Sequence, residues 1–327
     1  MSVGASPGGP AMKPDVLVLA ASPSPSVMAQ LDQYFTCHHA WKASGPAQAA
    51  LIDSVGERVR AVVTSGAVGI GAPLLARLPK AELVAVNGIG VDLVDVAALR
   101  ARGVAVTNTP GVLTEDVADL GLTLLLAVAR RLPALDRYVR EGQWERKVPL
   151  APSRSLRGKR AGIVGFGRIG QAMAARLAVL GMELRYFQPR PVAGSAIARA
   201  DSLLALAHES DYLVVCAPGT ASNRNMIDAA VLAALGPQGT LVNIGRGTLV
   251  DEAALISALQ NGELGAAALD VYADEPRVPA ALRALDNVVL TPHVASLTVE
   301  TRHAMGQLVI DNMLAHFAGK PLLTPVP

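Results

Sequence analysis

The chain has 327 residues, of which 51% are hydrophobic and 17% are charged, so it holds enough apolar material for about two domains with sizeable cores. Its formal net charge of +2 gives no reason to expect nucleic acid or an anionic membrane surface as a partner. No apolar run approaches the ~20 residues that span a bilayer. The two cysteines, Cys37 and Cys216, lie far apart and indicate no disulfide framework, which is typical of a reducing cytoplasm.

The N-terminal part of the chain predicts one α/β domain. Residues 1–14 are rich in Gly, Pro and Ser and lack the features of a signal peptide, so we expect a disordered tail. Four short apolar runs follow, and Ala/Leu-rich stretches of helical character separate them. These runs are DVLVLA (15–20), RAVVTS (60–65), ELVAVNG (82–88) and VAVTNT (104–109). Apolar strands that alternate with helices favour a parallel sheet buried on both faces.

A long apolar helix is predicted next, over 114–131. Thr114 is a candidate N-cap, and Glu115 and Asp116 suit the positive end of a helix. Pro133 is expected to end it. Because the middle of this helix is apolar almost all round, we expect it to be buried in a core or between subunits.

A second series of strands and helices begins near residue 160. Strands are predicted at 161–166, 183–188, 211–217, 240–244, 267–272 and 287–291, and a last helix at 298–318. The final helix is expected to complete the N-terminal domain. The prediction is therefore an α/β fold of two Rossmann-like or flavodoxin-like domains with parallel sheets. Residues 15–106 with 294–327 would bind the substrate, residues 107–293 would bind a dinucleotide, and the active site would lie in the cleft between the domains.

The sequence GFGRIG contains the glycine pattern of a dinucleotide-binding turn, with Gly165, Gly167 and Gly170. It follows an apolar strand and opens a helix. The first glycine permits the tight turn, the second lets the backbone approach a pyrophosphate, and the third lets helix and strand pack closely. The helix N-terminus then offers free N–H groups to phosphate. Arg168 lies in the first turn and is a candidate for a further charge-assisted contact.

The stretch RYFQPRP, Arg185 to Pro191, indicates which nucleotide is bound. Gln188 stands where many NAD-binding proteins have an Asp or Glu that contacts the ribose hydroxyls. An acid there would repel the extra phosphate of NADP, and Gln removes that repulsion. Arg190 is the candidate cation for this phosphate and Arg185 a weaker one. The alternative is that both arginines are solvated surface charges.

Three further segments carry candidate chemistry. Arg246 lies in VNIGRG, Asp270 and Glu275 lie in LDVYADEP, and His293 lies in LTPHVAS. Each segment follows a predicted strand, at the sheet edge where open α/β folds bind ligands. Arg can hold a carboxylate or 2-oxo acid through two hydrogen bonds, and His can lend a proton near neutral pH. A Glu beside the His would favour the imidazolium and orient it.

Each of these residues alone would be read as an ordinary surface or structural side chain, and their shared placement beside a nucleotide motif is what favours a site. A metal site is not expected. In Cys37-His38-His39, adjacent residues on a strand point to opposite faces.

Taken in order, GFGRIG, NIGRG, LDVYADEP and TPHVAS resemble the D-isomer-specific 2-hydroxyacid dehydrogenases. The resemblance covers nearly the whole chain from about Asp15 onward. The stretches VTNTPGVLTEDVADLGLTLLLAVARR, RYVREGQW and HFAGKPLLTPVP are most similar to the glyoxylate/hydroxypyruvate reductase and hydroxyphenylpyruvate reductase branch.

The resemblance implies roles for matching residues. Arg246 would bind the substrate carboxylate and keto oxygen, with His293 as acid/base and Glu275 as its partner. The backbone amides of Ile89, Gly90 and Val91 would help hold the carboxylate, and Trp144 would reach into the active site of a partner subunit. The candidate cofactor contacts are Gly165, Gly167, Arg168, Ile169, Gly170, Gln188, Arg190, Pro218, Thr220, Ile244 and Asp270, the last through the nicotinamide carboxamide.

The expected reaction is therefore the reduction of a small 2-oxo acid, glyoxylate or hydroxypyruvate, to the D-2-hydroxy acid by a cytoplasmic homodimer. NADPH is the expected cofactor, with NADH weaker. NADP-preferring relatives often place an arginine directly after the small polar residue that ends this strand. In this chain Pro189 separates Gln188 from Arg190. Two alternatives are kept, a reductase of aryl-pyruvates such as hydroxyphenylpyruvate and a non-catalytic nucleotide-sensing co-regulator that binds peptides.

Overall fold

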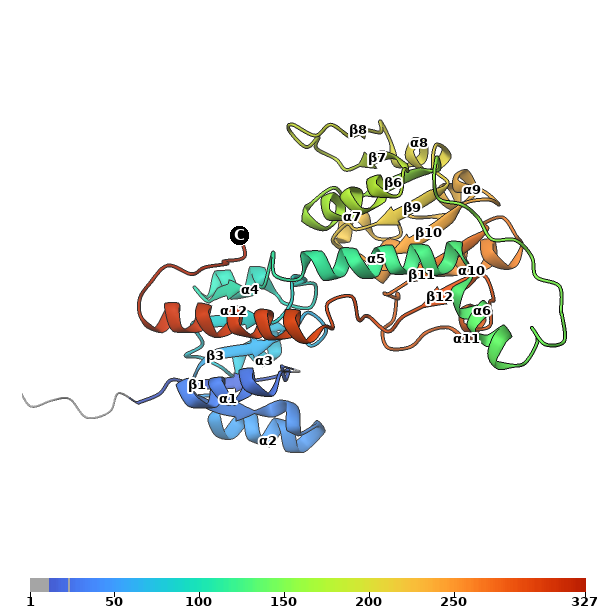
Figure 1. Ribbon diagram of the computed structural model, residues 1–327. Coiled ribbons are helices and arrows are strands. Elements are labelled where there is room, and N and C mark those ends of the chain that lie inside the picture. Colours follow the sequence, from blue (N-terminus) through green and yellow to red (C-terminus); the bar gives the residue numbers. More distant parts are fainter. Residues whose placement is uncertain (1–11, 23) are drawn as a thin grey trace, which may run out of the picture. The chain divides into compact units, whose positions relative to one another are not determined.

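The computed structural model describes residues 12–22 and 24–327, so residues 1–11 of the predicted N-terminal tail lie outside the described part. The chain folds into two compact units (Figure 1). The first unit comprises the described residues up to Leu113 together with Thr298–Pro327, and the second unit comprises Thr114–Leu297. Both boundaries lie a few residues beyond the predicted ones. The substrate-binding and dinucleotide-binding roles given to the two domains stay predictions.

The first unit is built on a five-stranded parallel sheet with the strand order β2-β1-β3-β4-β5. This is the flavodoxin-like order. The strands are β1 (Asp15–Val18), β2 (Thr36–His39), β3 (Val59–Thr64), β4 (Leu83–Val86) and β5 (Ala105–Thr107). The four apolar runs of the sequence do not include β2, because its residues TCHH do not form an apolar run.

Helices cover both faces of this sheet, because successive strand residues point to opposite sides. One core cluster joins Leu17, Val62 and Val84 to helices α2, α3 and α4, and the other joins Val16 and Ala61 to α1 and α12. The helices are α1 (Pro25–Tyr34), α2 (Gly45–Val55), α3 (Ala72–Ala76), α4 (Val96–Ala101) and α12 (Val299–Phe317), with a short η1 (Ala40–Lys42). The predicted final helix is thus confirmed within a residue or so at each end.

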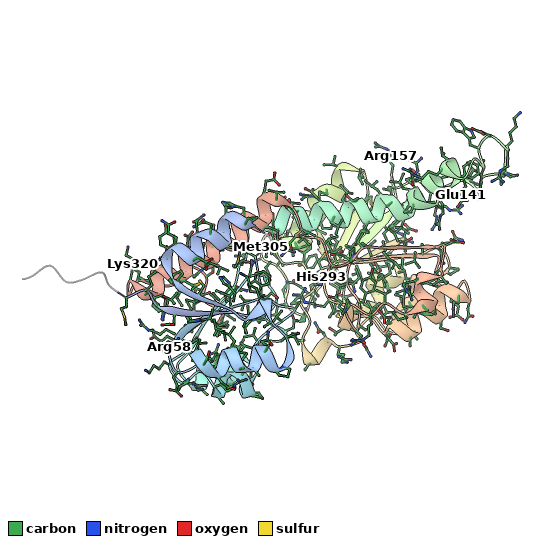
Figure 2. The ribbon with its side chains drawn as sticks, turned by 90° about the horizontal axis from the view of Figure 1, so that it is seen from below. Arg58, Glu141, Arg157, His293, Met305 and Lys320 are labelled. Carbon is green, nitrogen blue, oxygen red and sulfur yellow. The ribbon has the colours of Figure 1, made fainter. Side chains whose placement is uncertain are left out.

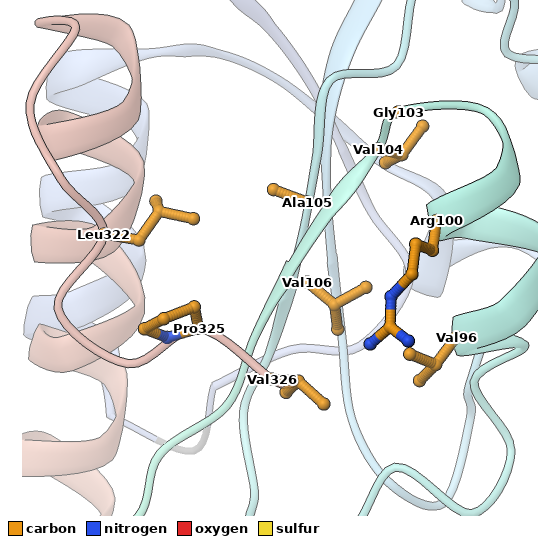
Figure 3. A pocket seen from close by; sticks show the side chains of 9 residues that line it. All are labelled: Val96, Arg100, Gly103, Val104, Ala105, Val106, Leu322, Pro325 and Val326. Carbon is orange, nitrogen blue, oxygen red and sulfur yellow. The ribbon is translucent and has the colours of Figure 1, made fainter.

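The last residues of the chain run beside the edge strand β5. The Val326 N–H donates to the Val106 carbonyl at 2.8 Å, and the Thr324 hydroxyl donates to the Asn108 carbonyl at 2.7 Å. Between this stretch, β5 and α4 lies a hollow of about 270 Å³ (Figure 3). Arg100 is the one charged residue among the described residues that line it.

The second unit contains a seven-stranded parallel sheet with the strand order β12-β11-β10-β9-β6-β7-β8. From β8 to β11 this is the doubly wound Rossmann order, in which the chain reverses direction across the sheet between β6 and β9. The strands are β6 (Arg160–Val164), β7 (Glu183–Phe187), β8 (Ala198–Arg199), β9 (Tyr212–Val215), β10 (Thr240–Asn243), β11 (Ala266–Leu269) and β12 (Val288–Leu290). The parallel two-domain α/β fold expected from the sequence is confirmed.

Helices enclose this second sheet. One apolar cluster unites alternate strand residues such as Leu213 and Leu241 with buried residues of α8, α9 and α10, while α5 packs on α7 and on the strands β10 to β12. The helices are α5 (Thr114–Ala129), α6 (Leu132–Arg140), α7 (Arg168–Val179), α8 (Leu203–His208), α9 (Ala229–Leu235), α10 (Glu252–Gln260) and α11 (Ala280–Arg283), with η2 (Ala221–Asn223) and η3 (Gly247–Leu249).

The ends of the long helix α5 differ from the prediction. Thr114 is the first helical residue, and its buried hydroxyl has no hydrogen-bond partner, so it is not an N-cap. The helix ends at Ala129, and Arg131 takes a left-handed conformation with φ 53°. Pro133 lies in the first turn of α6, because a proline needs no N–H partner there. Among residues 12–22 and 24–327, no helix combines the length and apolar content that crossing a membrane requires.

Candidate active site

The glycine motif forms the turn between β6 and α7, where the strand order reverses. Gly165 has φ +86°, and a Cβ at Gly170 would lie 2.1 Å from the Gly165 carbonyl oxygen. Gly167, which precedes the first turn of α7, has nothing within 4 Å of its Cβ position, and Arg168 beside it is exposed. Gly165 and Gly170 therefore permit the tight packing of the turn, and Gly167 leaves the backbone accessible at the helix N-terminus. The turn fits a pyrophosphate.

Gln188 lies directly after β7 and connects the glycine turn to the loop that follows this strand. Its Oε1 accepts a hydrogen bond from the Phe166 N–H at 3.0 Å, and its Nε2 donates to the Arg190 carbonyl at 2.7 Å. A carboxylate at this position could accept the first bond but could not donate the second. The amide therefore fixes the loop that carries Arg190, whose side chain is exposed. Arg185 is engaged elsewhere, in an ion pair with Glu209.

The loops after β9 and β10 lie directly beside the glycine turn. A Cβ at Gly165 would lie 2.7 Å from the Ala217 backbone, and a Cβ at Gly245 would lie 2.7 Å from the Ala217 carbonyl oxygen. Beyond Ala217, the Asn223 side chain accepts from the Thr220 N–H at 2.7 Å and donates to the Pro218 carbonyl at 2.8 Å. The glycine turn and the loop of Arg246 thus both pack against Ala217.

Arg246 is held by an internal scaffold at the end of β10. The side chain of the buried Asn243 donates to the Arg246 carbonyl and accepts from the Gly245 N–H, both at 3.0 Å. The Arg246 Nη1 donates to the Gly245 carbonyl at 2.7 Å. The next residue must be glycine, because a Cβ at Gly247 would lie 1.9 Å from the Tyr272 carbonyl carbon. Arg246 is therefore fixed against the chain that leads to Glu275.

Glu275 and His293 form a hydrogen-bonded pair at the same edge of the sheet (Figure 2 labels His293). The His293 Nδ1 lies 2.7 Å from the Glu275 Oε2, and the Glu275 Oε1 accepts from the Tyr272 N–H at 3.0 Å. Since Nδ1 meets the carboxylate, Nε2 is the ring nitrogen left to exchange a proton with a ligand. The His293 side chain is 43% exposed, so a ligand can reach it.

Asp270 holds the turn on which His293 lies, a role that the sequence reasoning missed. His293 has φ 55°, a conformation that costs a non-glycine residue about 1–3 kcal/mol. The carboxylate of Asp270 accepts from the Thr291 hydroxyl at 2.7 Å, the Val294 N–H at 2.9 Å and the Ala295 N–H at 3.0 Å. Asp270 is completely buried. Burial raises the pKa of its carboxyl group and outweighs these hydrogen bonds, which lower it. Its suggested contact with the nicotinamide stays a prediction.

The electrostatic environment of Glu275 favours its charged form. Burial raises its pKa, but the hydrogen bonds from His293 and Tyr272 and the charges of His293 and Arg246 outweigh burial, so the net pKa is lowered. Ionised Glu275 therefore stabilises the fold at pH values above the ordinary glutamate pKa of about 4.3. That stabilisation is lost as the pH falls below this value and through the folded-state pKa.

Glu275→Gln tests this linkage. At about pH 7 the free energy of urea unfolding should be larger for the wild type than for the variant, and the difference should shrink as the pH drops below about 4.3. Glu263→Gln, which replaces an exposed glutamate of the same unit, is the matched control for the loss of one carboxylate. A difference between wild type and Glu275→Gln that stays constant down to about pH 3.5 would contradict the assignment.

The remaining candidates lie elsewhere. In the first unit, Ile89, Gly90 and Val91 form the loop after β4, where the Asn108 side chain donates to the Ile89 carbonyl at 2.9 Å. In the second unit, Trp144 follows α6 and is 70% exposed. The histidines of β2 have separate acidic partners, since His38 bonds Asp15 and His39 bonds Asp32.

The fold and this set of residues define a nucleotide-dependent dehydrogenase of known lineage. The family model of the D-isomer specific 2-hydroxyacid dehydrogenase, NAD binding domain, matches residues 122–295. The chain belongs to the D-isomer-specific 2-hydroxyacid dehydrogenase family. The family predicted from the four sequence motifs is confirmed. The prediction of an enzyme with a nicotinamide cofactor is confirmed as well.

Named relatives place the chain more narrowly. It is 44% identical over 297 residues to glyoxylate/hydroxypyruvate reductase A HPR2 of Arabidopsis thaliana, and 46% identical over 297 residues to hydroxyphenylpyruvate reductase of Plectranthus scutellarioides. Each match covers 91% of this chain and 94% of the relative. The crystal structure of NADPH-dependent glyoxylate/hydroxypyruvate reductase from Sinorhizobium meliloti in complex with NADP and malonate has a TM-score of 0.87 at 42% identity, covering 96% of this chain and 97% of that one.

Proposed function

We propose that this protein reduces small 2-oxo acids, with glyoxylate and hydroxypyruvate as its first substrates, to D-2-hydroxy acids with a preference for NADPH. The observation that carries the proposal is the junction of Arg246, Glu275 and His293 beside the glycine turn, in one unit of a chain that belongs to this dehydrogenase family. The names of the similar proteins from Arabidopsis thaliana and Sinorhizobium meliloti support the choice of substrate and cofactor.

The chain's residues divide the chemistry among them. Arg246 would bind the substrate carboxylate and stabilise negative charge on the keto oxygen through paired hydrogen bonds. Backbone amides of Ile89, Gly90 and Val91 would add to the carboxylate contacts. A bound nicotinamide would supply the hydride to the keto carbon. His293 would then give the proton on Nε2 to the keto oxygen, while Glu275 keeps the ring oriented through Nδ1.

The cofactor preference follows from the loop after β7. Gln188 places no negative charge beside the adenosine ribose, and Arg190 is an exposed cation two residues further along. A 2′-phosphate would meet no repulsion there and would gain a charge-assisted hydrogen bond. The remaining contacts to the nucleotide would come from the glycine turn with Arg168 and Ile169, from Pro218, Thr220 and Ile244, and from Asp270.

An aryl-pyruvate is the second candidate substrate. The relative from Plectranthus scutellarioides, which is 46% identical, is named hydroxyphenylpyruvate reductase. The same three residues would serve this reaction, because the reacting group is again a 2-oxo acid.

We further propose a cytoplasmic homodimer. Trp144 is 70% exposed, and α6 beside it exposes Leu132 and Val139. Exposed large apolar side chains in one short stretch of chain favour association with another protein surface. In the dimer, Trp144 would contribute to the substrate site of the partner subunit. Light scattering during gel filtration should give twice the mass of one chain for the wild type, and the mass of a single chain would contradict the proposal.

A panel of 2-oxo acids tests the function directly. Glyoxylate, hydroxypyruvate and phenylpyruvate are each added to the enzyme with NADPH or NADH, and cofactor oxidation is followed by absorbance. We expect the largest kcat/KM with NADPH and one of the two small acids. A higher value for phenylpyruvate would favour the second candidate, and turnover with none of the acids would favour the non-catalytic, nucleotide-sensing role.

A further inference from the structure

Arg199 braces the loop that would read the adenosine ribose. It lies on the edge strand β8, eleven residues after Gln188. Its Nε donates to the Gln188 carbonyl at 2.9 Å and its Nη2 to the Pro189 carbonyl at 3.3 Å, and its guanidinium carbon lies 6.0 Å from the centre of the Phe187 ring. The guanidinium of Arg199 therefore bonds two successive carbonyl groups and also lies near the ring of the residue before them.

The amide of Gln188 completes this arrangement. Its Nε2 donates to the Arg190 carbonyl at 2.7 Å, so the carbonyl groups of Gln188, Pro189 and Arg190 all accept bonds from side-chain N–H groups. A carbonyl oxygen carries partial negative charge and repels a phosphate. In this loop, three successive carbonyl oxygens accept hydrogen bonds, two of them from a cation. The loop therefore repels a phosphate much less than it would with these oxygens unbonded.

We propose that Arg199 is a positioning residue for the 2′-phosphate of NADPH. It fixes the backbone from Gln188 to Pro189, so that the side chain of Arg190 is presented to the ribose. This explains how the site can tolerate Pro189 between Gln188 and the arginine, because the proline, which has no N–H, is held through its carbonyl instead. The inference rests on the proposed preference for NADPH and names a residue that sets it.

Two adenosine fragments give a test that does not depend on catalysis. Adenosine 2′,5′-bisphosphate and AMP differ only in the 2′-phosphate, and their Kd values for the full chain are measured by titration calorimetry. The wild type should bind the bisphosphate at least about tenfold more tightly. Arg199→Met should lower this ratio about fivefold while the Kd of AMP changes less than twofold. The ratio of kcat/KM for NADPH to that for NADH should fall in parallel.

Matched variants separate positioning from a general effect of charge. Arg283→Met removes another arginine that donates to a backbone carbonyl, next to the strand at the opposite edge of the same sheet, and it should leave the ratio unchanged. The double variant Arg190→Met/Arg199→Met should lose no more than Arg190→Met alone, because Arg199 acts through the placement of Arg190. Arg199→Lys, which keeps the charge but lacks the two-pronged geometry, should give an intermediate ratio and carries the test if Arg199→Met does not fold.

Each contrary outcome identifies what fails. A wild type that does not distinguish the two fragments overturns the proposed NADPH preference and this inference with it. A wild type that distinguishes them, with an Arg199→Met variant that does so equally well, overturns the inference alone. An equal loss of affinity for both fragments, or losses at Arg190 and Arg199 that add, would also overturn the positioning role.

Discussion

Replacing His293 by alanine is expected to lower kcat for the NADPH-dependent reduction of glyoxylate or hydroxypyruvate by about 10²- to 10⁴-fold, the range in which a positioned general acid contributes. The Kd of NADPH should change less than twofold, because the proposed nucleotide contacts of the glycine turn and the 188–190 loop do not involve the imidazole. Steady-state kinetics and a fluorescence titration of NADPH measure the two quantities separately.

The expected size of this effect follows from the geometry around the ring. The Nδ1 of His293 lies 2.7 Å from the Oε2 of Glu275. The turn that carries His293 is held by three hydrogen bonds to the Asp270 carboxylate. The ring is therefore oriented before a substrate arrives, and Nε2 can give its proton without a search for the correct geometry. No other described histidine is paired with a carboxylate at this edge of the second unit.

A second histidine of the same unit serves as the control. His208 is exposed at the end of α8, and His208→Ala should keep kcat within about twofold of the wild type, as surface changes away from a site do. Near-normal turnover in His293→Ala would remove His293 from the acid/base role. The family membership would stand in that case, since it rests on the whole chain.

The location of the site can be predicted from the sequence, because apolar runs indicate where the strands end. Arg246, Glu275 and His293 each follow an apolar run, and parallel strands bring their carboxyl ends to one edge. The structure brings these three residues together. Their chemical roles still rest on the resemblance and on the experiments proposed above.

The residues that support the site could not be predicted in the same way. Asp270 meets its partners 21 to 25 residues later in the chain, and Arg199 meets the 188–190 loop from a two-residue strand. Both contacts depend on how loops fold, and loops carry no periodic pattern that would reveal it. Gln188 could be predicted only in part. The sequence shows that it replaces the usual Asp or Glu, but not that its side chain bonds the Arg190 carbonyl.

The ends of elements were missed for a related reason. Pro133 has the composition of a helix terminator, yet it begins α6, because proline suits the first turn of a helix as well as the residues beyond its end. Local chemistry alone does not decide between the two, and the left-handed Arg131 that separates α5 from α6 is not marked by a glycine.

Replacing Arg246 by methionine is expected to lower kcat/KM for the 2-oxo acid by about 10²- to 10⁴-fold. Two charge-assisted hydrogen bonds to the substrate would be lost, each contributing about 1.5–3 kcal/mol. The loss should divide between a higher KM, from weaker binding of the carboxylate, and a lower kcat, from weaker stabilisation of charge on the keto oxygen. Initial rates over a range of glyoxylate concentrations at saturating NADPH separate the two parts.

Two further variants make this experiment specific. Arg246→Lys should recover part of the KM but little of the kcat, because a single ammonium group cannot form two parallel bonds. Arg224→Met removes an exposed arginine of the same unit and should leave both constants unchanged. An Arg246→Met variant with a normal KM for glyoxylate would mean that another cation binds the carboxylate. The scaffold that Asn243 and Gly247 build around Arg246 would then have only a structural role.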